Sequence, residues 1–101
     1  MFKTPLDLRA HTPGEWVLLN PLVWNDIVVP AGFITDLASI PKIFRNIEDQ
    51  NGLSRRPAVL HDYLYCLQPF EKLLVDQLFR TALIAEGMNR FSAEVYYRFL
   101  S

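Results

Sequence analysis

The sequence of 101 residues has little cysteine, little glycine and no excess of charge of either sign. Its one cysteine, Cys66, excludes an internal disulfide and a zinc site built from several cysteines. Its formal net charge of -1 provides no overall positive field that would hold a nucleic-acid backbone. Its four glycines lie far apart, which excludes a glycine-rich phosphate loop. We therefore expect no nucleic acid as a partner.

Long apolar runs are also absent. A membrane-spanning helix needs roughly 20 consecutive apolar residues, and the longest stretches here, such as residues 73–75, are interrupted within a few positions. Pro5 and Asp7 interrupt the first residues, which lack the apolar run of a secretory signal peptide. The sequence therefore predicts no membrane span.

Apolar residues make up 50% of the chain and aromatic residues 13%, which is too rich for a disordered segment. A chain of this length suits one domain and leaves no room for a second. We therefore predict a single domain over residues 1–101, with a β-rich part at 1–36 and a helical part at 39–101.

Four short segments in the first third have the β-branched and aromatic composition of strands. They are residues 15–19, 22–24, 27–29 and 33–35. Turn-forming pairs such as Asn25-Asp26 separate them. This pattern predicts a small antiparallel β meander that is twisted and covered on one face.

The apolar pattern changes to a helical period after Asp36. A serine and a proline predict a helix start at 39–41, and a polar loop follows at 46–52. We expect Ser54 to cap the next helix, which carries Pro57 in its first turn and ends near residue 67.

Two further helices are predicted by apolar residues at helical spacing, at 71–86 and 92–100. Gly87 is expected to stop the first of them. Strands that precede helices indicate the α+β class, as a small N-terminal antiparallel β meander with three to four helices packed on it.

Two segments combine ionisable residues with a distinctive order of residue types. They read VPAGFITDLASIP at residues 29–41 and RPAVLHDYLY at residues 56–65. On these two segments the sequence resembles a family of small proteins that is common in bacteriophage and prophage genomes and is classed as a domain of unknown function. The resemblance covers roughly residues 15–86 and includes Asp76 and Phe79. Two motifs at a consistent separation are more specific than one short pattern.

This resemblance implies a protein that is made in the host cytoplasm, with phage or host proteins as partners. It favours a virion-associated structural or interaction protein, for instance one near the tail. The aromatic residues Tyr96, Tyr97 and Phe99 cover more than one face of the last predicted helix. They can anchor contacts with other proteins or with a second copy of the chain. Alternatively, these three aromatic side chains are buried in the core together with Trp16 and Trp24.

Asp36, His61 and Asp62 are the candidate catalytic residues. Asp36 ends a predicted strand, and the other two lie in the middle of a predicted helix. An Asp–His pair can act as a general base. Asp36, His61 and Asp76 form an alternative set of metal ligands, because an imidazole with carboxylates can bind a divalent cation and leave positions for water. Such a centre would suit a small metal-dependent hydrolase that acts on a peptide or on the cell wall.

Each of these residues also has a structural interpretation. Asp36 can cap the helix expected at 39–41. His61 can be a core histidine that bonds to Asp36 or to a main-chain carbonyl. We expect Cys66 to be a buried small hydrophobe and His11 to be an exposed loop residue.

The remaining carboxylates have candidate partners nearby in the sequence. Asp62 can pair with Arg55 or Arg56 on the solvated side of its helix. Asp76 and Arg80 are one helical turn apart, which is the spacing of a surface ion pair. A structural network between sheet and helices is therefore an alternative to a catalytic centre.

Overall fold

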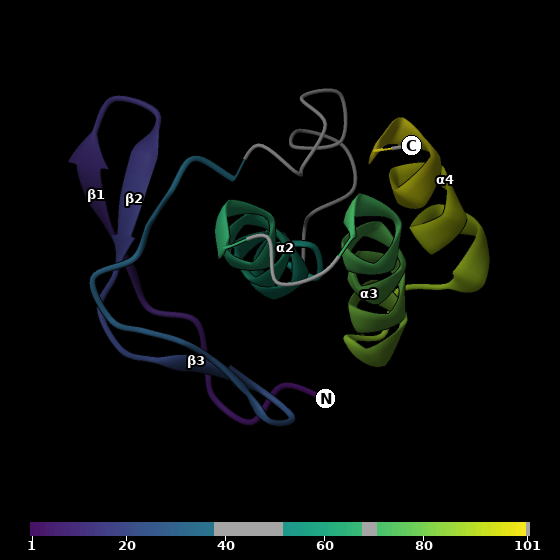
Figure 1. The fold of residues 1–101 in the computed structure, drawn as a ribbon, viewed down its shortest axis with the longest axis horizontal. Helices are drawn as coiled ribbons and strands as arrows, with labels where there is room; N and C mark the ends of the chain where they lie inside the picture. Colours follow the sequence, from purple (N-terminus) through teal and green to yellow (C-terminus); the bar gives the residue numbers. More distant parts are fainter. Residues whose placement is uncertain (38–51, 68–70, 101) are drawn as a thin grey trace.

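The computed structural model describes residues 1–37, 52–67 and 71–100. Within these residues, five strands are followed by three helices (Figure 1). The elements are β1 (Leu8–Thr12), β2 (Glu15–Leu18), β3 (Leu22–Trp24), β4 (Ile27–Val29), β5 (Ile34–Thr35), α2 (Arg55–Leu67), α3 (Lys72–Ala85) and α4 (Arg90–Leu100). The helix start expected at 39–41 and most of the loop expected at 46–52 lie outside the described residues.

The strands form two small antiparallel sheets. In one sheet β2 lies between β1 and β5, and in the other β3 pairs with β4. The predicted Asn25-Asp26 turn joins β3 to β4, and Asn25 adopts a φ of 49°, in the left-handed region that asparagine tolerates. Antiparallel strands followed by helices confirm the α+β class.

Strand β1 was not among the predicted strands. Four of its five residues are exposed, so the segment lacks the apolar alternation that marks a half-buried strand. Main-chain pairing with β2 defines it instead, with Ala10 opposite Trp16. His11 therefore lies in an exposed strand, and the prediction of a loop at this residue was wrong.

Helix α2 occupies the predicted segment. It begins directly after Ser54, whose carbonyl accepts a hydrogen bond from the Ala58 N–H at 2.9 Å, and it ends at Leu67. Pro57 lies in the first turn, where backbone N–H groups have no acceptor within the helix.

Helix α3 occupies the segment predicted at 71–86 and is followed by Gly87 at a φ of 110°. Helix α4 begins earlier than the predicted start at Ser92. The Asn89 Oδ1 atom accepts a hydrogen bond from the Ser92 N–H at 2.8 Å, so Asn89 is the capping residue and Ser92 lies inside the helix. None of the three described helices has the length and apolar composition needed to cross a membrane.

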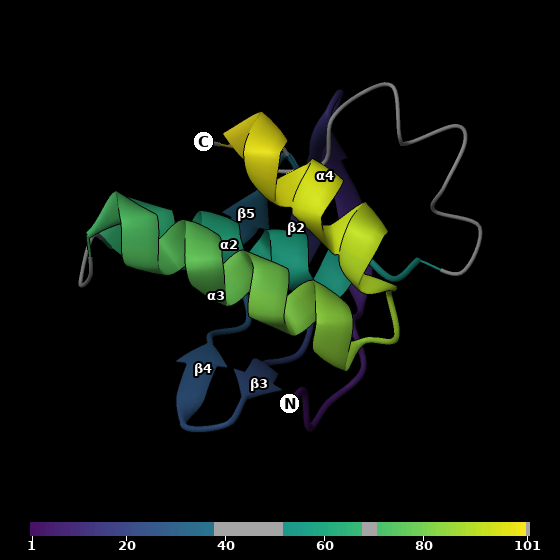
Figure 2. The same ribbon diagram turned by 90° about the vertical axis from the view of Figure 1, so that its right-hand side faces the viewer.

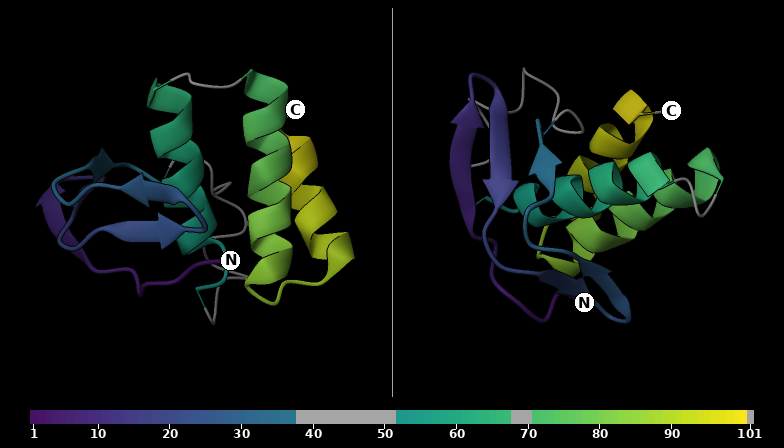
Figure 3. Two further views of the ribbon diagram at one scale, coloured as in Figure 1. Left: turned by 60° about the horizontal axis from the view of Figure 1, so that its bottom comes forward. Right: turned by 60° about the vertical axis from the view of Figure 1, so that its left-hand side comes forward.

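Helix α2 lies between the strands and α3, and α4 packs on α3 away from the strands (Figures 1 and 2). Helices α2 and α3 run antiparallel (Figure 3). One cluster of buried apolar side chains joins the strands to α2 and α3, and includes Leu18, Leu22 and Leu60. A second cluster, which includes Phe79 and Tyr96, joins the three helices. Side chains of α2 therefore meet the strands on one face and α3 on another.

Candidate functional site

The four candidate residues separate into two groups that lie against different faces of α2. His61 and Asp62 are adjacent in the sequence, and successive residues of an α-helix point about 100° apart. His61 bonds to Asp76 of α3, whereas Asp62 bonds to Thr35 of β5. The charge of Asp36, which directly follows β5, acts on Asp62.

His61 makes a buried polar contact between α2 and α3. Its Nε2 atom is 2.7 Å from Asp76 Oδ1, and the two residues are 8% and 2% exposed. The imidazole ring also meets the Phe79 ring edge-on, with 5.4 Å between ring centroids. The antiparallel packing of α2 and α3 places Asp76 beside the Nε2 atom, a partner that was not considered for His61 as a core histidine.

The second oxygen of Asp76 is engaged by Lys72. The Lys72 ammonium donates to Asp76 Oδ2 at 2.7 Å, and this hydrogen bond raises the pKa of Lys72. The expected Asp76–Arg80 pair was wrong, since Arg80 bonds to Glu94 of α4 at 2.9 Å. Lys72 and Arg80 are equally distant from Asp76 in the sequence, and α4 provides Glu94 as the partner of Arg80.

Asp62 faces the strands. Its Oδ2 atom accepts a hydrogen bond from the Thr35 hydroxyl at 2.8 Å. The hydroxyl oxygen of Thr35 in turn accepts a hydrogen bond from the Leu37 N–H at 3.1 Å. The expected ion pair of Asp62 with Arg55 or Arg56 was wrong. In the described part of the chain neither arginine bonds to Asp62, because this face of α2 points toward β5.

The surroundings of Asp62 disfavour its charged form. Burial raises the pKa of this carboxyl, and the nearby Asp36 carboxylate raises it further, while the Thr35 hydrogen bond opposes the change. Asp36 itself is exposed and precedes Leu37, which adopts a φ of 57°. A half-buried carboxyl beside a second carboxylate is an arrangement that can hold or release a proton.

Cys66 lies one turn after Asp62 on α2, with its Sγ atom 3.9 Å from Asp62 Oδ1. It is exposed, so the prediction of a buried small hydrophobe was wrong. Its place in the last turn of α2 leaves the side chain exposed. Partial burial of the sulfur and the neighbouring Asp62 charge raise the pKa of the thiol, which makes it a poor nucleophile at neutral pH.

The expected metal ligands Asp36, His61 and Asp76 are divided between the two groups. Asp36 acts on Asp62, whereas His61 and Asp76 bond to each other. In the segments 1–37, 52–67 and 71–100, no three or more His, Cys, Asp or Glu side chains are placed together in a way that could hold a metal ion.

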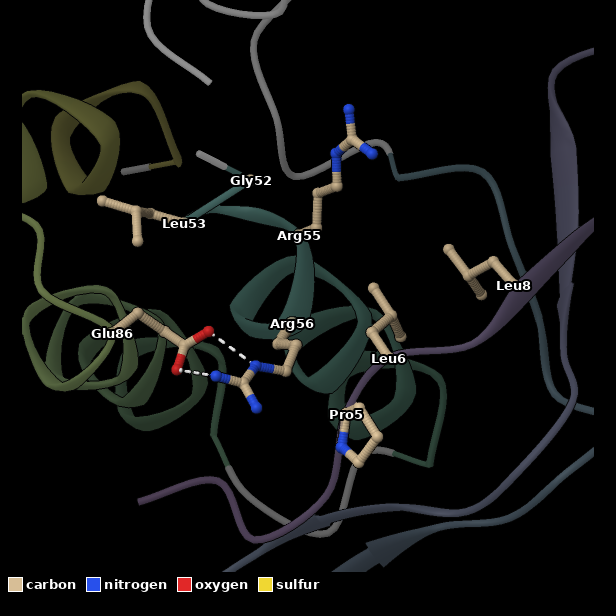
Figure 4. Close-up of a pocket in the computed structure, with 8 residues that line it drawn as sticks. All are labelled: Pro5, Leu6, Leu8, Gly52, Leu53, Arg55, Arg56 and Glu86. Atoms are coloured by element: carbon tan, nitrogen blue, oxygen red, sulfur yellow. Dashed lines mark hydrogen bonds and ion pairs between the residues drawn. The ribbon is translucent and has the colours of Figure 1, made fainter. Parts of the chain in front are cut away.

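A cleft that the sequence did not indicate opens at the start of α2. Its volume is about 570 Å³, and it lies beside an ion pair between Arg56 and Glu86 (Figure 4). Arg56 donates from Nε to Glu86 Oε2 and from Nη2 to Glu86 Oε1, both at 2.6 Å. Thirty positions separate the two residues, so no local spacing pattern signals this pair.

The aromatic residues divide between core and surface. Tyr96 and Trp24 are buried, and Arg80 lies 4.5 Å above the centre of the half-buried Tyr97 ring. Phe99 and Phe91 are exposed, the latter by 80%. Other large apolar side chains are exposed on the helices as well, namely Tyr65, Leu67, Leu73, Leu74 and Ile84.

Comparison with known proteins finds one family. A family model described as "Protein of unknown function (DUF1353)" matches residues 16–99. No curated protein and no solved structure matches the chain.

Proposed function

The chain belongs to the family described as proteins of unknown function (DUF1353), and from its side chains we propose that it is a phage- or prophage-encoded interaction protein. It acts by binding other proteins, as a structural component of the virion in the tail region. Its sequence resemblance to phage-associated proteins supports the phage or prophage origin. The apolar side chains on its surface support the role in binding other proteins.

The observation that carries the proposal is the exposure of large apolar side chains on the helices. Phe91, in the first turn of α4, is 80% exposed. Leu73 and Leu74, which follow each other in the first turn of α3, are 56% and 52% exposed. Single exposed apolar residues are common. Aromatic and aliphatic anchors of this size are nevertheless the residues that contribute most to protein–protein binding when a partner covers them.

The ionisable residues of the helical layer support the same conclusion. Both carboxylate oxygens of Asp76 are engaged, by His61 and by Lys72. A group whose acceptors are used inside the protein holds two helices together and leaves little capacity for a substrate. The polar contact between α2 and α3 therefore fixes the relative position of two helices that carry exposed apolar residues.

Particle composition tests this proposal. Phage particles are purified from a strain that lacks the protein and is complemented with either the wild type or Phe91→Ser/Leu74→Ser. Mass spectrometry should detect the wild type at a stoichiometric level and the double variant at a strongly reduced level. Val28→Ser is the control, because Val28 of β4 is 50% exposed, close to the 52% of Leu74, and this variant should be incorporated normally.

Absence of the wild-type protein from particles would refute the virion assignment. A double variant that is incorporated as well as Val28→Ser would refute the role of the helical surface. Thermal melting of both variants checks that they are folded, and removal of exposed side chains is expected to leave the core unchanged.

A second candidate function is a small metal-dependent hydrolase of peptidase or cell-wall type. The observation in its favour is the pair of neighbouring carboxylates, Asp36 and Asp62, of which Asp62 has a raised pKa. Binding of Mn²⁺ or Zn²⁺ by the wild type, with loss of binding in Asp36→Asn and Asp62→Asn, would support this function. In that case Asp36→Asn and Asp62→Asn should each abolish hydrolysis while the protein remains folded.

A further inference from the structure

We infer that the outer face of α3 binds a second copy of this chain, with the α3 helices of the two copies antiparallel about a two-fold axis. The inference rests on the proposed function, because Leu73 and Leu74 belong both to this face and to the exposed residues that carry that proposal. One partner of these apolar residues is then another molecule of the same protein.

Six residues of α3 form an outer face that carries no charge. At about 100° per residue they lie within an arc of about 120°, and all but Gln77 are exposed. In the described part of the chain α3 packs against α2 and α4, and its buried side chains lie outside this arc. Figure 2 shows α3 in front of α2 and below α4. The six residues are Leu73, Leu74, Gln77, Thr81, Ile84 and Ala85.

This face is mostly apolar. Leu73 and Leu74 are 56% and 52% exposed at its start, and Ile84 is 39% exposed near its end. The Thr81 hydroxyl donates to the Gln77 carbonyl oxygen at 3.1 Å, so this polar group is engaged within the helix. Interfaces between proteins are poor in charge at their centre and gain free energy from the burial of apolar side chains. The face therefore suits a protein surface that is itself apolar and uncharged.

The face is complementary to itself when two copies run antiparallel. Its midpoint is at the level of Phe79, and a two-fold axis at that level places Leu74 of one copy opposite Ile84 of the other. Leu73 then lies opposite Ala85, which sets a large side chain against a small one. Each of these contacts occurs twice in the dimer, as in every two-fold interface. The formal net charge of -1 adds little repulsion between the two copies.

Gln77 suits a position near this axis. It is one of the two polar residues of the face and lies two positions before the midpoint, so the two Gln77 residues are about 6 Å apart along the helices. A side-chain amide has both donors and an acceptor, so the amides of two copies can bond to each other. A second copy therefore provides the polar partner that this residue needs in an otherwise apolar contact.

The charges at the two ends of α3 favour the antiparallel order. Glu71, directly before α3, is exposed, and its carboxylate caps no backbone N–H. Arg90, the first residue of α4, is exposed at the opposite end of α3 (Figure 3). Glu94, one turn after Arg90, bonds instead to Arg80 and Arg98. Antiparallel copies bring Glu71 of each toward Arg90 of the other, whereas parallel copies would bring like charges together.

Sedimentation velocity of the purified protein provides the test. The wild type should form a dimer and no larger species in a concentration series from about 10 to about 500 µM, the range expected for a small interface. Leu74→Ser should weaken the dimer at least about tenfold, because the contact is lost twice. Val28→Ser, which removes an apolar residue of similar exposure from β4, is the matched control and should dimerise like the wild type.

Charge reversal tests the antiparallel order. Glu71→Arg and Arg90→Glu should each weaken the dimer at least about tenfold, and the double variant should recover it. An equimolar mixture of the two single variants should also recover it, because each then provides the charge that the other lacks. Asp26→Arg, at an exposed residue of the β3–β4 turn, changes the net charge as Glu71→Arg does and should dimerise like the wild type.

A monomer at every concentration, growth beyond two copies, or equal association of Leu74→Ser and the wild type would overturn the inference. Failure of the double variant or of the mixture to recover the dimer would also overturn it. Thermal melting checks that each variant is folded. Incorporation into phage particles is measured separately. A monomeric protein that enters particles leaves the proposed function standing, and a dimer that is absent from particles refutes the virion assignment alone.

Discussion

His61 Nε2 and Asp76 Oδ1 lie 2.7 Å apart between α2 and α3, with both side chains buried. This contact is polar, whereas the residues around it are mostly apolar. A hydrogen bond to a buried carboxylate contributes more than an average one, and removing one partner leaves the other without its bond. The contact is therefore expected to stabilise the antiparallel packing of these two helices.

Replacement of His61 by alanine should lower the free energy of unfolding by about 2–4 kcal/mol, because a buried hydrogen bond is lost and a cavity remains. Urea unfolding followed by circular dichroism measures this change. Tyr65→Ala, at a half-exposed residue one turn later on α2, is the control and should lower the free energy of unfolding by less. A double-mutant cycle with Asp76→Ala should show coupling of about 1–3 kcal/mol, and additive losses would contradict a direct contact.

The stability of the protein should depend on the charge of Asp62. Since the folded protein raises the pKa of this carboxyl, it binds more protons than the unfolded chain between the ordinary and the raised pKa. The free energy of unfolding should therefore fall as pH rises through that window and remain lower above it.

Asp62→Asn removes this effect while its amide oxygen can still accept the Thr35 hydrogen bond. The variant should melt at a higher temperature than the wild type at about pH 7, and the difference should narrow toward about pH 4. Asp26→Asn, at an exposed carboxylate in the β3–β4 turn, makes the same change of charge and is the control. Equal melting curves of Asp62→Asn and wild type at neutral pH would show that burial does not penalise this charge.

The thiol of Cys66 should react slowly in spite of its exposure. Partial burial and the Asp62 charge raise its pKa, and only the thiolate is the nucleophile. Iodoacetamide should therefore modify it slowly at about pH 7, with the rate increasing as the solution becomes more alkaline. Asp62→Asn should accelerate the reaction at a fixed pH. An unchanged rate in that variant would mean that the carboxylate does not act on the sulfur.

The bond between Arg56 and Glu86 should require the shape of arginine and not only its charge. Arg56→Lys keeps the charge but cannot reproduce two parallel bonds, and it should cost about 1–2 kcal/mol. Arg56 also bonds to the Thr4 carbonyl and so helps to hold the N-terminal segment. The Lys3 amide hydrogen, which is bonded to the Val23 carbonyl, should therefore exchange with solvent faster in the variant.

Hydrogen exchange followed by NMR measures the Lys3 amide directly. Arg98→Lys is the control, since Arg98 is largely exposed and its contact with Glu94 is 3.5 Å long. A Lys3 amide as protected in Arg56→Lys as in the wild type would show that the N-terminal segment is held by other contacts.

Local features of the structure were accessible from the sequence. The helix between Ser54 and residue 67, the helix that ends before Gly87 and the turn at Asn25-Asp26 each depend on residues within a few positions of one another. Capping preferences and helical or alternating periodicity act over this range. The exposed strand β1 was missed because its pairing is made by main-chain groups, which leave no pattern in the side chains.

The candidate site could be predicted from the sequence only in part. Asp36, His61, Asp62 and Asp76 were selected as ionisable residues within or near two motifs, but their grouping was not evident. Neighbours on a helix face different directions, so the adjacent His61 and Asp62 belong to different contacts. No sequence pattern indicated the cleft beside Arg56, since its walls come from three segments that are distant in the sequence.

The amino-acid order alone decided the α+β class, the limits of α2 and α3 and the turn between β3 and β4, because these follow from short-range preferences of the chain. The packing of the helices and strands decided which side chains meet. His61 meets Asp76 across 15 positions, Asp62 meets Thr35 across 27, and Arg56 meets Glu86 across 30. A charged residue has several candidate partners at such distances along the chain. The choice among them depends on which helix face is turned toward which neighbour, and this is a property of the folded molecule.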